Sequence, residues 1–135
     1  MKYLLVTGGR AYADRAHVFA ELDRRQPDLV LHGGAKTWDR KRSAMVGADH
    51  FAGEWADERG KPCIVMPAPW KGLGKAAGPR RNGWLLAAAL RLAKDHAHLS
   101  CLAFPGDSGT ADMKRRCLEA GLLVEEVQAP AGQPE

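Results

Sequence analysis

Short runs of apolar residues, each ending at glycine or proline, recur along the chain and constrain its fold more than any other feature. Tyr3–Val6 leads into Thr-Gly-Gly, Leu29–Leu31 into His-Gly-Gly, and Leu99–Phe104 into Pro-Gly. Cys63–Met66 runs up to Pro67, and a last strand is expected at Leu122–Val127. Strands that are apolar on both faces are typical of parallel sheets covered by helices on each side. The runs therefore predict a mostly parallel sheet of about five strands.

Helical patterns separate these runs. They are expected over residues 14–25, 48–59, 79–94 and 109–120, with Asp14 as the N-cap of the first. Strands that alternate with helices, joined by right-handed crossovers, give a doubly covered parallel sheet. The predicted fold class is α/β, a Rossmann-like three-layer sandwich.

The chain of 135 residues fits one domain, which we expect to span residues 1–127. Residues 128–135 are expected to form a disordered tail. The first residues do not resemble a secretory signal, and no stretch approaches the roughly 20 apolar residues of a membrane span. We therefore expect a cytoplasmic protein without membrane contact.

The net charge of +4 is concentrated in two segments. Residues 36–42 carry four basic side chains and one acid, and residues 71–82 carry four basic side chains and no acid. The three cysteines are odd in number and form no CxxC pair, so neither a disulfide framework nor a zinc ribbon is expected. The histidines show no ligand spacing either, and we predict no metal and no cofactor.

Ligands of open parallel sheets bind outside the carboxyl ends of the strands, so the residues after each predicted strand are the candidate site. Each glycine turn by itself is most simply a tight turn, and Ser108 can serve as a helix cap. Several such turns at one edge indicate a phosphate site, because glycine lets backbone N–H groups approach an anion. The candidate ligand-binding residues in these turns are Gly8, Gly9, Arg10, Gly33, Gly34, Ala35, Gly78, Gly106, Ser108, Gly109 and Thr110.

Arg80 and Arg81 follow Pro79, which can open a helix. Cations in the first turn of a helix oppose its macrodipole, and a bound anion would offset that cost. The alternative is that both arginines point into water. Asn82 belongs to the same candidate site, and Lys75 lies in a glycine-rich stretch that we expect to be flexible enough to fold over a ligand.

Two tryptophans and one acid complete the candidates. Trp70 and Trp38 lie in polar loops, where each either stacks on a base or holds its own loop in place, and Trp70 is the stronger candidate. Asp49 falls at a predicted helix start, where it either caps the helix or binds a ribose hydroxyl.

Taken together, these motifs resemble the YspA-type branch of the SLOG superfamily, whose members are common in phage and bacterial genomes. The resemblance runs in order from about residue 3 to residue 124 and implies a Rossmann-like fold with a ligand site at these loops. Relatives in the superfamily often pair through helices, which implies a homodimer or higher homo-oligomer, with the helix from Arg80 to Lys94 as its contact. The motifs that carry the resemblance to the family are TGGR (7–10), HGGA (32–35), GAD (47–49), PAPW (67–70), GKAAGPRRN (74–82) and FPGDSGT (104–110).

The wider superfamily includes LOG-type phosphoribohydrolases, which carry PGGxGTxxE with a catalytic glutamate. Here Asp107 replaces the second glycine, and Met113 stands at the glutamate position. Asp112 is one residue early, which turns it by about 100° on a helix. Asp49, Asp107 and Asp112 are therefore weak catalytic candidates, and whether the protein is an enzyme is left open.

A further departure from the family pattern is a basic insertion of eleven residues at 36–46. It is either a lid over a polyanionic ligand or a contact to nucleic acid.

Three functions remain open. The glycine turns and paired arginines favour a sensor or sequestering domain for a nucleotide-derived small molecule, possibly phage-encoded. The second is an N-glycosidase or phosphoribohydrolase acting on a nucleoside monophosphate, which needs a carboxylate near the reacting sugar. The third is single-stranded nucleic-acid binding by analogy with DprA, although no helix carries a continuous basic stripe.

Overall fold

A computed structural model describes residues 1–128 of the chain, so nearly all of the predicted tail at 128–135 lies outside the described residues. The strands of the main sheet are β1 (Tyr3–Thr7), β2 (Leu29–His32), β5 (Cys63–Val65), β6 (Leu99–Ala103) and β7 (Leu123–Glu126). The helices are α1 (Arg15–Arg25), α2 (Ala48–Glu58), α3 (Trp70–Leu73), α4 (Ala77–Ala93) and α5 (Ser108–Glu119), with short 3-10 helices η1 (Gly74–Ala76) and η2 (His96–His98).

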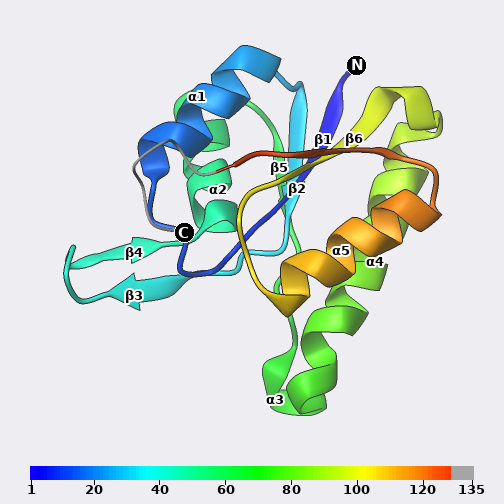
Figure 1. The fold of residues 1–135 in the computed structure, drawn as a ribbon. Coiled ribbons are helices and arrows are strands. Elements are labelled where there is room, and N and C mark those ends of the chain that lie inside the picture. The colour runs from blue at the N-terminus through cyan, green and yellow to red at the C-terminus, as the bar shows by residue number, and fades with distance from the viewer. Residues whose placement is uncertain (129–135) are drawn as a thin grey trace.

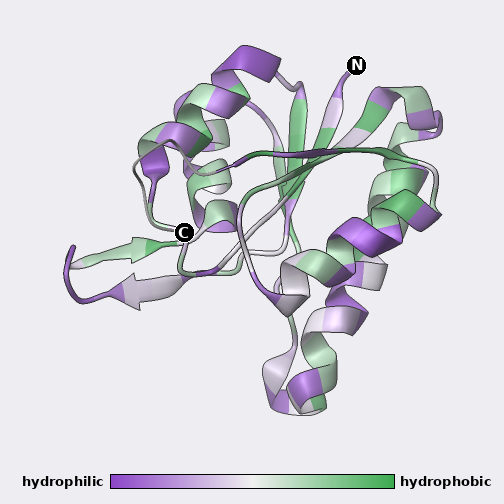
Figure 2. Ribbon diagram, in the orientation of Figure 1, coloured by the Kyte–Doolittle hydropathy of each residue, from purple (hydrophilic) through white to green (hydrophobic). Residues whose placement is uncertain are grey.

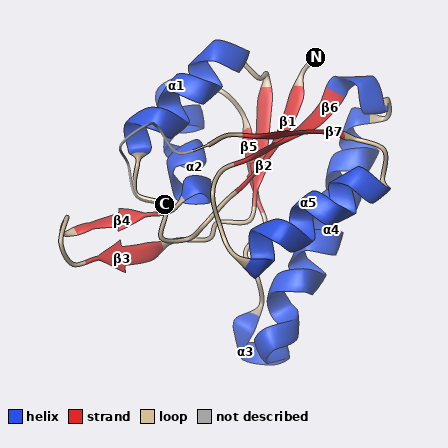
Figure 3. Cartoon of the chain, viewed as in Figure 1, coloured by secondary structure: helices blue, strands red, loops and turns tan. Residues whose placement is uncertain are grey.

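The main sheet has the order β5-β2-β1-β6-β7, and every neighbouring pair is parallel. Helices α1 and α2 cover one face of the sheet, and α4 and α5 cover the other (Figures 1 and 3). The predicted α/β class and the Rossmann-like three-layer sandwich with five strands are therefore confirmed.

Two apolar clusters hold the layers together, one on each face of the sheet. Because side chains alternate along each strand, neighbouring residues of a strand belong to different clusters. In β1, Leu4 and Val6 pack with α1 and α2, whereas Leu5 packs with α4 and α5. Trp55 of α2 and Met113 of α5 are fully buried on opposite sides. In Figure 2 the central strands are largely coloured as hydrophobic, and the helices alternate between hydrophobic and hydrophilic bands.

The strands of the main sheet are added on both sides of β1. The chain runs outward through β2 to β5, then returns to β6 on the other side of β1 and continues to β7. The order therefore reverses between β1 and β6, which is the position where ligands bind in folds of this kind.

Two segments differ from the sequence-based expectation. The insertion at 36–46 forms an antiparallel hairpin of β3 (Thr37–Asp39) and β4 (Ala44–Val46), separate from the main sheet. The stretch expected to be a flexible loop is helical, since α3 and η1 lead directly into α4, which begins at Ala77 rather than at Pro79. Neither α3 nor η1 contains a buried residue, so both lie on the surface.

Within the part of the chain that is described, no helix is both long and apolar enough to cross a bilayer. Helix α4 leaves Trp84 and Leu92 partly exposed, at 47% and 37%. Self-association through this helix stays a prediction.

Candidate functional site

A cavity of about 470 Å³ opens at the carboxyl edge of the sheet, beside the reversal between β1 and β6. Its walls come from the ends of β1 and β2, the first turn of α2, the α3–α4 segment and the start of α5. The residues that line it are Val6, Thr7, Gly8, Arg10, Gly33, Ala35, Asp49, Trp70, Lys75, Gly78, Pro79, Arg81, Asn82, Leu85, Asp107, Ser108, Gly109, Thr110, Asp112 and Met113.

Most of the predicted site residues are thus brought together, and four are not. Gly9 and Gly106 lie behind the wall, where the N–H of Gly9 donates to the carbonyl of Pro105 (2.9 Å) and ties the two loops to each other. Gly34 and Arg80 are likewise absent from the lining. A Cβ at Gly106 would lie 2.1 Å from Oγ1 of Thr110, so this glycine is required by packing.

Asp49 organises the loop after β2. The N-cap of α2 is Gly47, so Asp49 does not cap the helix and lies in its first turn instead. Its Oδ2 accepts hydrogen bonds from the N–H groups of Gly33 (3.1 Å) and Ala35 (3.2 Å). Its Oδ1 is buried and has no partner among the described residues. Burial raises the pKa of Asp49 to about 6, although these N–H groups and the charge of Arg81 lower it.

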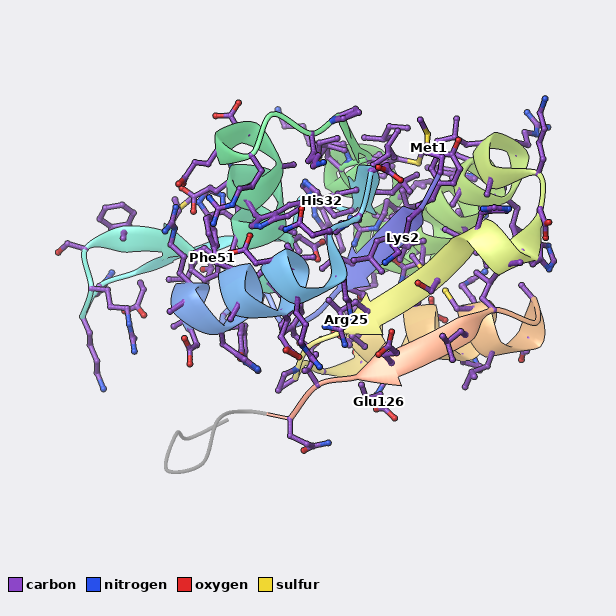
Figure 4. The ribbon with its side chains drawn as sticks, turned by 90° about the horizontal axis from the view of Figure 1, so that it is seen from above. Met1, Lys2, Arg25, His32, Phe51 and Glu126 are labelled. Atoms are coloured by element: carbon purple, nitrogen blue, oxygen red, sulfur yellow. The ribbon has the colours of Figure 1, made fainter. Side chains whose placement is uncertain are left out.

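His32 supplies a further hydrogen-bond acceptor to the loop after β2. Its Nδ1 accepts the N–H of Gly34 (2.9 Å), which leaves the proton on Nε2, a buried atom with no partner within residues 1–128. Burial, reinforced by the positive charges of Arg81 and His50, lowers the pKa of His32 to about 4, so the ring is neutral. Figure 4 labels His32, the last residue of β2, among the packed side chains.

Arg81 ties α4 to the strand ends. Its Nη1 donates to the carbonyl of Gly33 and to that of Met66 (3.3 Å), and its Nε donates to Oδ1 of Asn82 (3.0 Å). A Cβ at Gly33 would meet this guanidinium at 2.1 Å, which explains the glycine. Arg81 is half-buried on the cavity wall and carries its charge into the cavity.

The expectation of paired arginines in the first turn of a helix is wrong. Because α4 begins at Ala77, Arg81 falls in its second turn and reaches back to the strand ends. Arg80 is exposed and does not line the cavity.

Asn82 joins α4 to α5. Its Nδ2 donates to the carbonyl of Gly109 (3.2 Å) and to Oδ2 of Asp112 (3.1 Å). Asp112 also accepts from Arg116 (2.8 Å) and Arg115 (2.7 Å). Burial alone would raise the pKa of Asp112, but the hydrogen bonds from Arg116, Asn82 and Arg115 outweigh it and lower the pKa. A carboxylate held in this way is suited to a structural role rather than to proton transfer.

The first turn of α5 faces the cavity with free donors. Asp107 is the N-cap and accepts the N–H of Gly109 (3.2 Å), so Ser108 is the first helical residue and not the cap. The carbonyl of Asp107 accepts the N–H of Ala111. Within residues 1–128, no acceptor pairs with the N–H groups of Ser108 and Thr110. Free N–H groups at the positive end of a helix dipole form an anion site.

Three exposed side chains also line the cavity. Arg10 and Lys75 are exposed cations on the cavity rim, and none of the ion pairs within the described residues includes either. Trp70, now placed in α3, is 58% exposed and also lines the cavity. The indole lies close to Gly78, where a Cβ would be 3.4 Å from it.

The structure adds lining residues that sequence reasoning missed, namely Val6, Thr7, Pro79, Leu85 and Met113. Val6 was treated only as a strand residue, and Thr7 was placed in the turn after the strand without a ligand role. Met113 occupies the position where the LOG-type motif has glutamate, and it is buried at 1% exposure in the cavity floor. Met113 could have been predicted as a lining residue from its helical spacing, because it follows Gly109 by four residues and residues four apart lie on one face of a helix.

Comparison with known families gives one match. The model of the YspA, cpYpsA-related SLOG family matches residues 3–72. The chain belongs to this family. Membership suggests a nucleotide-related ligand-binding function, and the matched range holds the strands β1, β2 and β5 with their loops. No curated protein matches the chain.

Only part of the cavity lining lies within the range matched by the family. The matched range contains Arg10, Gly33 and Asp49, whereas α4 and the start of α5 lie beyond residue 72. No group of three or more His, Cys, Asp or Glu side chains that could hold a metal ion occurs in the described part of the chain.

Proposed function

We propose that the protein binds a nucleotide-derived, phosphate-containing small molecule in this cavity, as a sensing or sequestering domain of the cytoplasm. The observation that carries the proposal is the pair of free N–H groups at the start of α5, which face a cavity rimmed by Arg10 and Lys75. A volume of about 470 Å³ lies in the range of small-ligand sites, roughly 300–1,000 Å³.

Charge supports an anion at this end of the cavity. Arg10, Lys75 and Arg81 contribute positive charge, and Asp112 is neutralised by its own arginines. Asp107 and Asp49 are the opposing charges, since Asp107 caps α5 beside the donors and Asp49 also lines the cavity. Cationic side chains on flexible stems can close on a phosphate once it is bound.

Trp70 supports a base in the same cavity. A half-exposed indole on a cavity wall offers a flat apolar face, and stacking on an aromatic side chain is a general way to hold a nucleobase. Phosphate donors and an aromatic face in one cavity match the two ends of a nucleotide.

Isothermal titration against nucleoside monophosphates, cyclic nucleotides and ADP-ribose tests the proposal, with the matching nucleosides as controls for the phosphate. We expect the double variant Arg10→Ala/Lys75→Ala to weaken binding of the phosphorylated ligands by about ten-fold or more, equal to about 1.4 kcal/mol. Arg80→Ala is the matched control, since this neighbouring arginine does not line the cavity. Absence of any ligand across the panel, or equal losses in both variants, contradicts the proposal.

A second candidate function is cleavage of an N-glycosidic bond in such a nucleotide. Asp49 favours it, because a buried carboxylate with a raised pKa and an unpartnered Oδ1 lies on the cavity wall. Met113 disfavours it, since an apolar side chain stands where LOG-type hydrolases carry glutamate. Prolonged incubation of pure protein with nucleoside monophosphates tests it: free base that Asp49→Asn abolishes supports cleavage, and no free base rejects it.

A further inference from the structure

The hairpin of β3 and β4, which we call the basic hairpin (residues 36–46), stands apart from the layered body. It forms its own two-stranded sheet and projects beyond α2 (Figures 1 and 4). Only its last residue, Val46, enters a core cluster. A hairpin of two three-residue strands gains little stability by itself, so its side chains have little packing role to serve.

The charge of the basic hairpin is largely unpaired. Lys36, Arg40, Lys41 and Arg42 are all exposed. Arg42 bonds to Asp39 (2.8 Å), which is the one acid of the hairpin. Within residues 1–128, no ion pair involves the other three cations. They form a concentrated positive charge free to meet an anionic partner.

A tryptophan lies among these cations. Trp38 is 57% exposed and pairs across the strands with Met45, which is 36% exposed. Side chains alternate along a strand, so Lys36 shares the face of Trp38, while buried Val46 lies on the opposite face. The Trp38 face therefore turns away from the core. An exposed aromatic flanked by unpaired cations is the combination with which proteins hold single-stranded nucleic acid.

We infer that the basic hairpin binds single-stranded nucleic acid, with a base stacked on Trp38 and phosphates on Lys36, Arg40 and Lys41. A single strand is favoured over a duplex because its bases are unstacked and free to meet the indole. This site is separate from the cavity, and the inference does not depend on the proposed function.

Fluorescence anisotropy with a short labelled oligothymidylate, measured across a series of salt concentrations, tests this site. Arg40→Ala/Lys41→Ala should reduce the slope of log K against log salt by about 1.4, since each phosphate contact on a single strand contributes about 0.7. Trp38→Ala should weaken binding about five-fold or more while leaving the slope unchanged, because stacking does not release counterions. The same sequence as a duplex should bind more weakly, and Trp38→Ala should not affect it.

Matched controls lie on α4. Trp84→Ala removes another exposed tryptophan, and Arg91→Ala/Lys94→Ala removes two other exposed cations; neither should change affinity or slope. Absence of binding at low salt overturns the inference, as do hairpin variants that bind like the unmodified protein or α4 variants that lose as much. Nucleotide titrations of the same folded variants should be unchanged, so failure at the hairpin is distinguishable from failure at the cavity.

Discussion

Two glycine-rich turns border the cavity, one at residues 33–35 after β2 and one at residues 106–110 leading into α5, and their backbone N–H groups have different partners. In the first turn, Asp49 and His32 accept all three N–H groups from within the protein. In the second turn, Asp107 accepts that of Gly109, and within residues 1–128 no acceptor pairs with those of Ser108 and Thr110.

The difference separates a supporting turn from a binding turn. The first turn holds Arg81 through the carbonyl of Gly33 and thereby fixes a cation on the cavity wall. The second turn offers donors at a helix N-terminus, where an anion gains both hydrogen bonds and the dipole. A glycine turn after a strand is therefore evidence for anion binding only when its N–H groups lack internal acceptors.

Replacing Asp49 should break the supporting turn with the largest effect. Asp49→Ala leaves the N–H groups of Gly33 and Ala35 without acceptors, at about 1–3 kcal/mol each. We expect the free energy of unfolding to fall by about 2–4 kcal/mol in denaturant titrations. Asp49→Asn keeps an oxygen for both groups and is the matched control. A loss in Asp49→Ala no larger than that in Asp49→Asn would mean that these bonds do not support the turn.

The pH dependence of stability sharpens the role of the same turn. The pKa of Asp49 rises from 3.8 to about 6 on folding, so its contribution to stability falls as the pH rises through this range. The pKa of His32 falls from 6.5 to about 4, so its contribution rises with pH over nearly the same range. The two trends oppose each other in the unmodified protein.

Single substitutions should therefore expose each trend. Asp49→Asn leaves a stability that rises between about pH 4 and 6.5, and His32→Asn leaves one that falls between about pH 4 and 6, each by roughly 3 kcal/mol. Urea titrations at several pH values measure both. Parallel curves for the two variants would refute this assignment.

Two glycines of the binding turn should respond differently to alanine. A Cβ at Gly106 would lie 2.1 Å from Thr110 and 2.8 Å from the nitrogen of Gly9, so Gly106→Ala should cost about 1–3 kcal/mol of stability. A Cβ at Gly109 meets nothing closer than 3.8 Å, so Gly109→Ala should fold normally. Its methyl group should weaken nucleotide binding by about ten-fold, or about 1.4 kcal/mol. Thermal melts and titration calorimetry separate the two; a Gly109→Ala protein with full affinity would argue against the binding turn.

The smallest effect is expected at Asp107. Asparagine caps a helix as well as aspartate does, so Asp107→Asn should leave stability nearly unchanged. Removing the negative charge beside the free donors should tighten binding of phosphorylated ligands by roughly 0.3–1 kcal/mol, or about two- to five-fold. The gain should shrink in high salt and be absent for nucleosides. Equal gains for nucleosides would show that the charge does not face a phosphate.

Much of the fold follows from local sequence rules. Short apolar runs, most of them ending at glycine or proline, locate the strands of the main sheet, and Asp14 caps α1 as predicted by accepting the N–H of His17 (3.0 Å). The helical α3–η1 segment was not predictable from its glycines, because its conformation is set by continuity with α4. The basic hairpin was also missed, since its short strands carry charges in place of an apolar alternation.

The location of the candidate site was predictable from the sequence, but the hydrogen bonds within the site were not. Strand ends and glycines locate the edge, and most of the predicted residues line one cavity. No local pattern shows that Asp49 accepts from Gly33 and Ala35, or that Arg81 reaches back while Arg80 stays in solvent. These outcomes depend on contacts between residues far apart in sequence. Function as a nucleotide binder stays a proposal.

The most direct test of the account is a backbone amide NMR titration of the ¹⁵N-labelled protein with whichever phosphorylated nucleotide binds in calorimetry. The account predicts the largest downfield shifts at the amides of Ser108 and Thr110, with small changes at Gly33, Gly34 and Ala35, whose N–H groups already have acceptors. Large shifts confined to residues 33–35, with Ser108 and Thr110 unmoved, would contradict it.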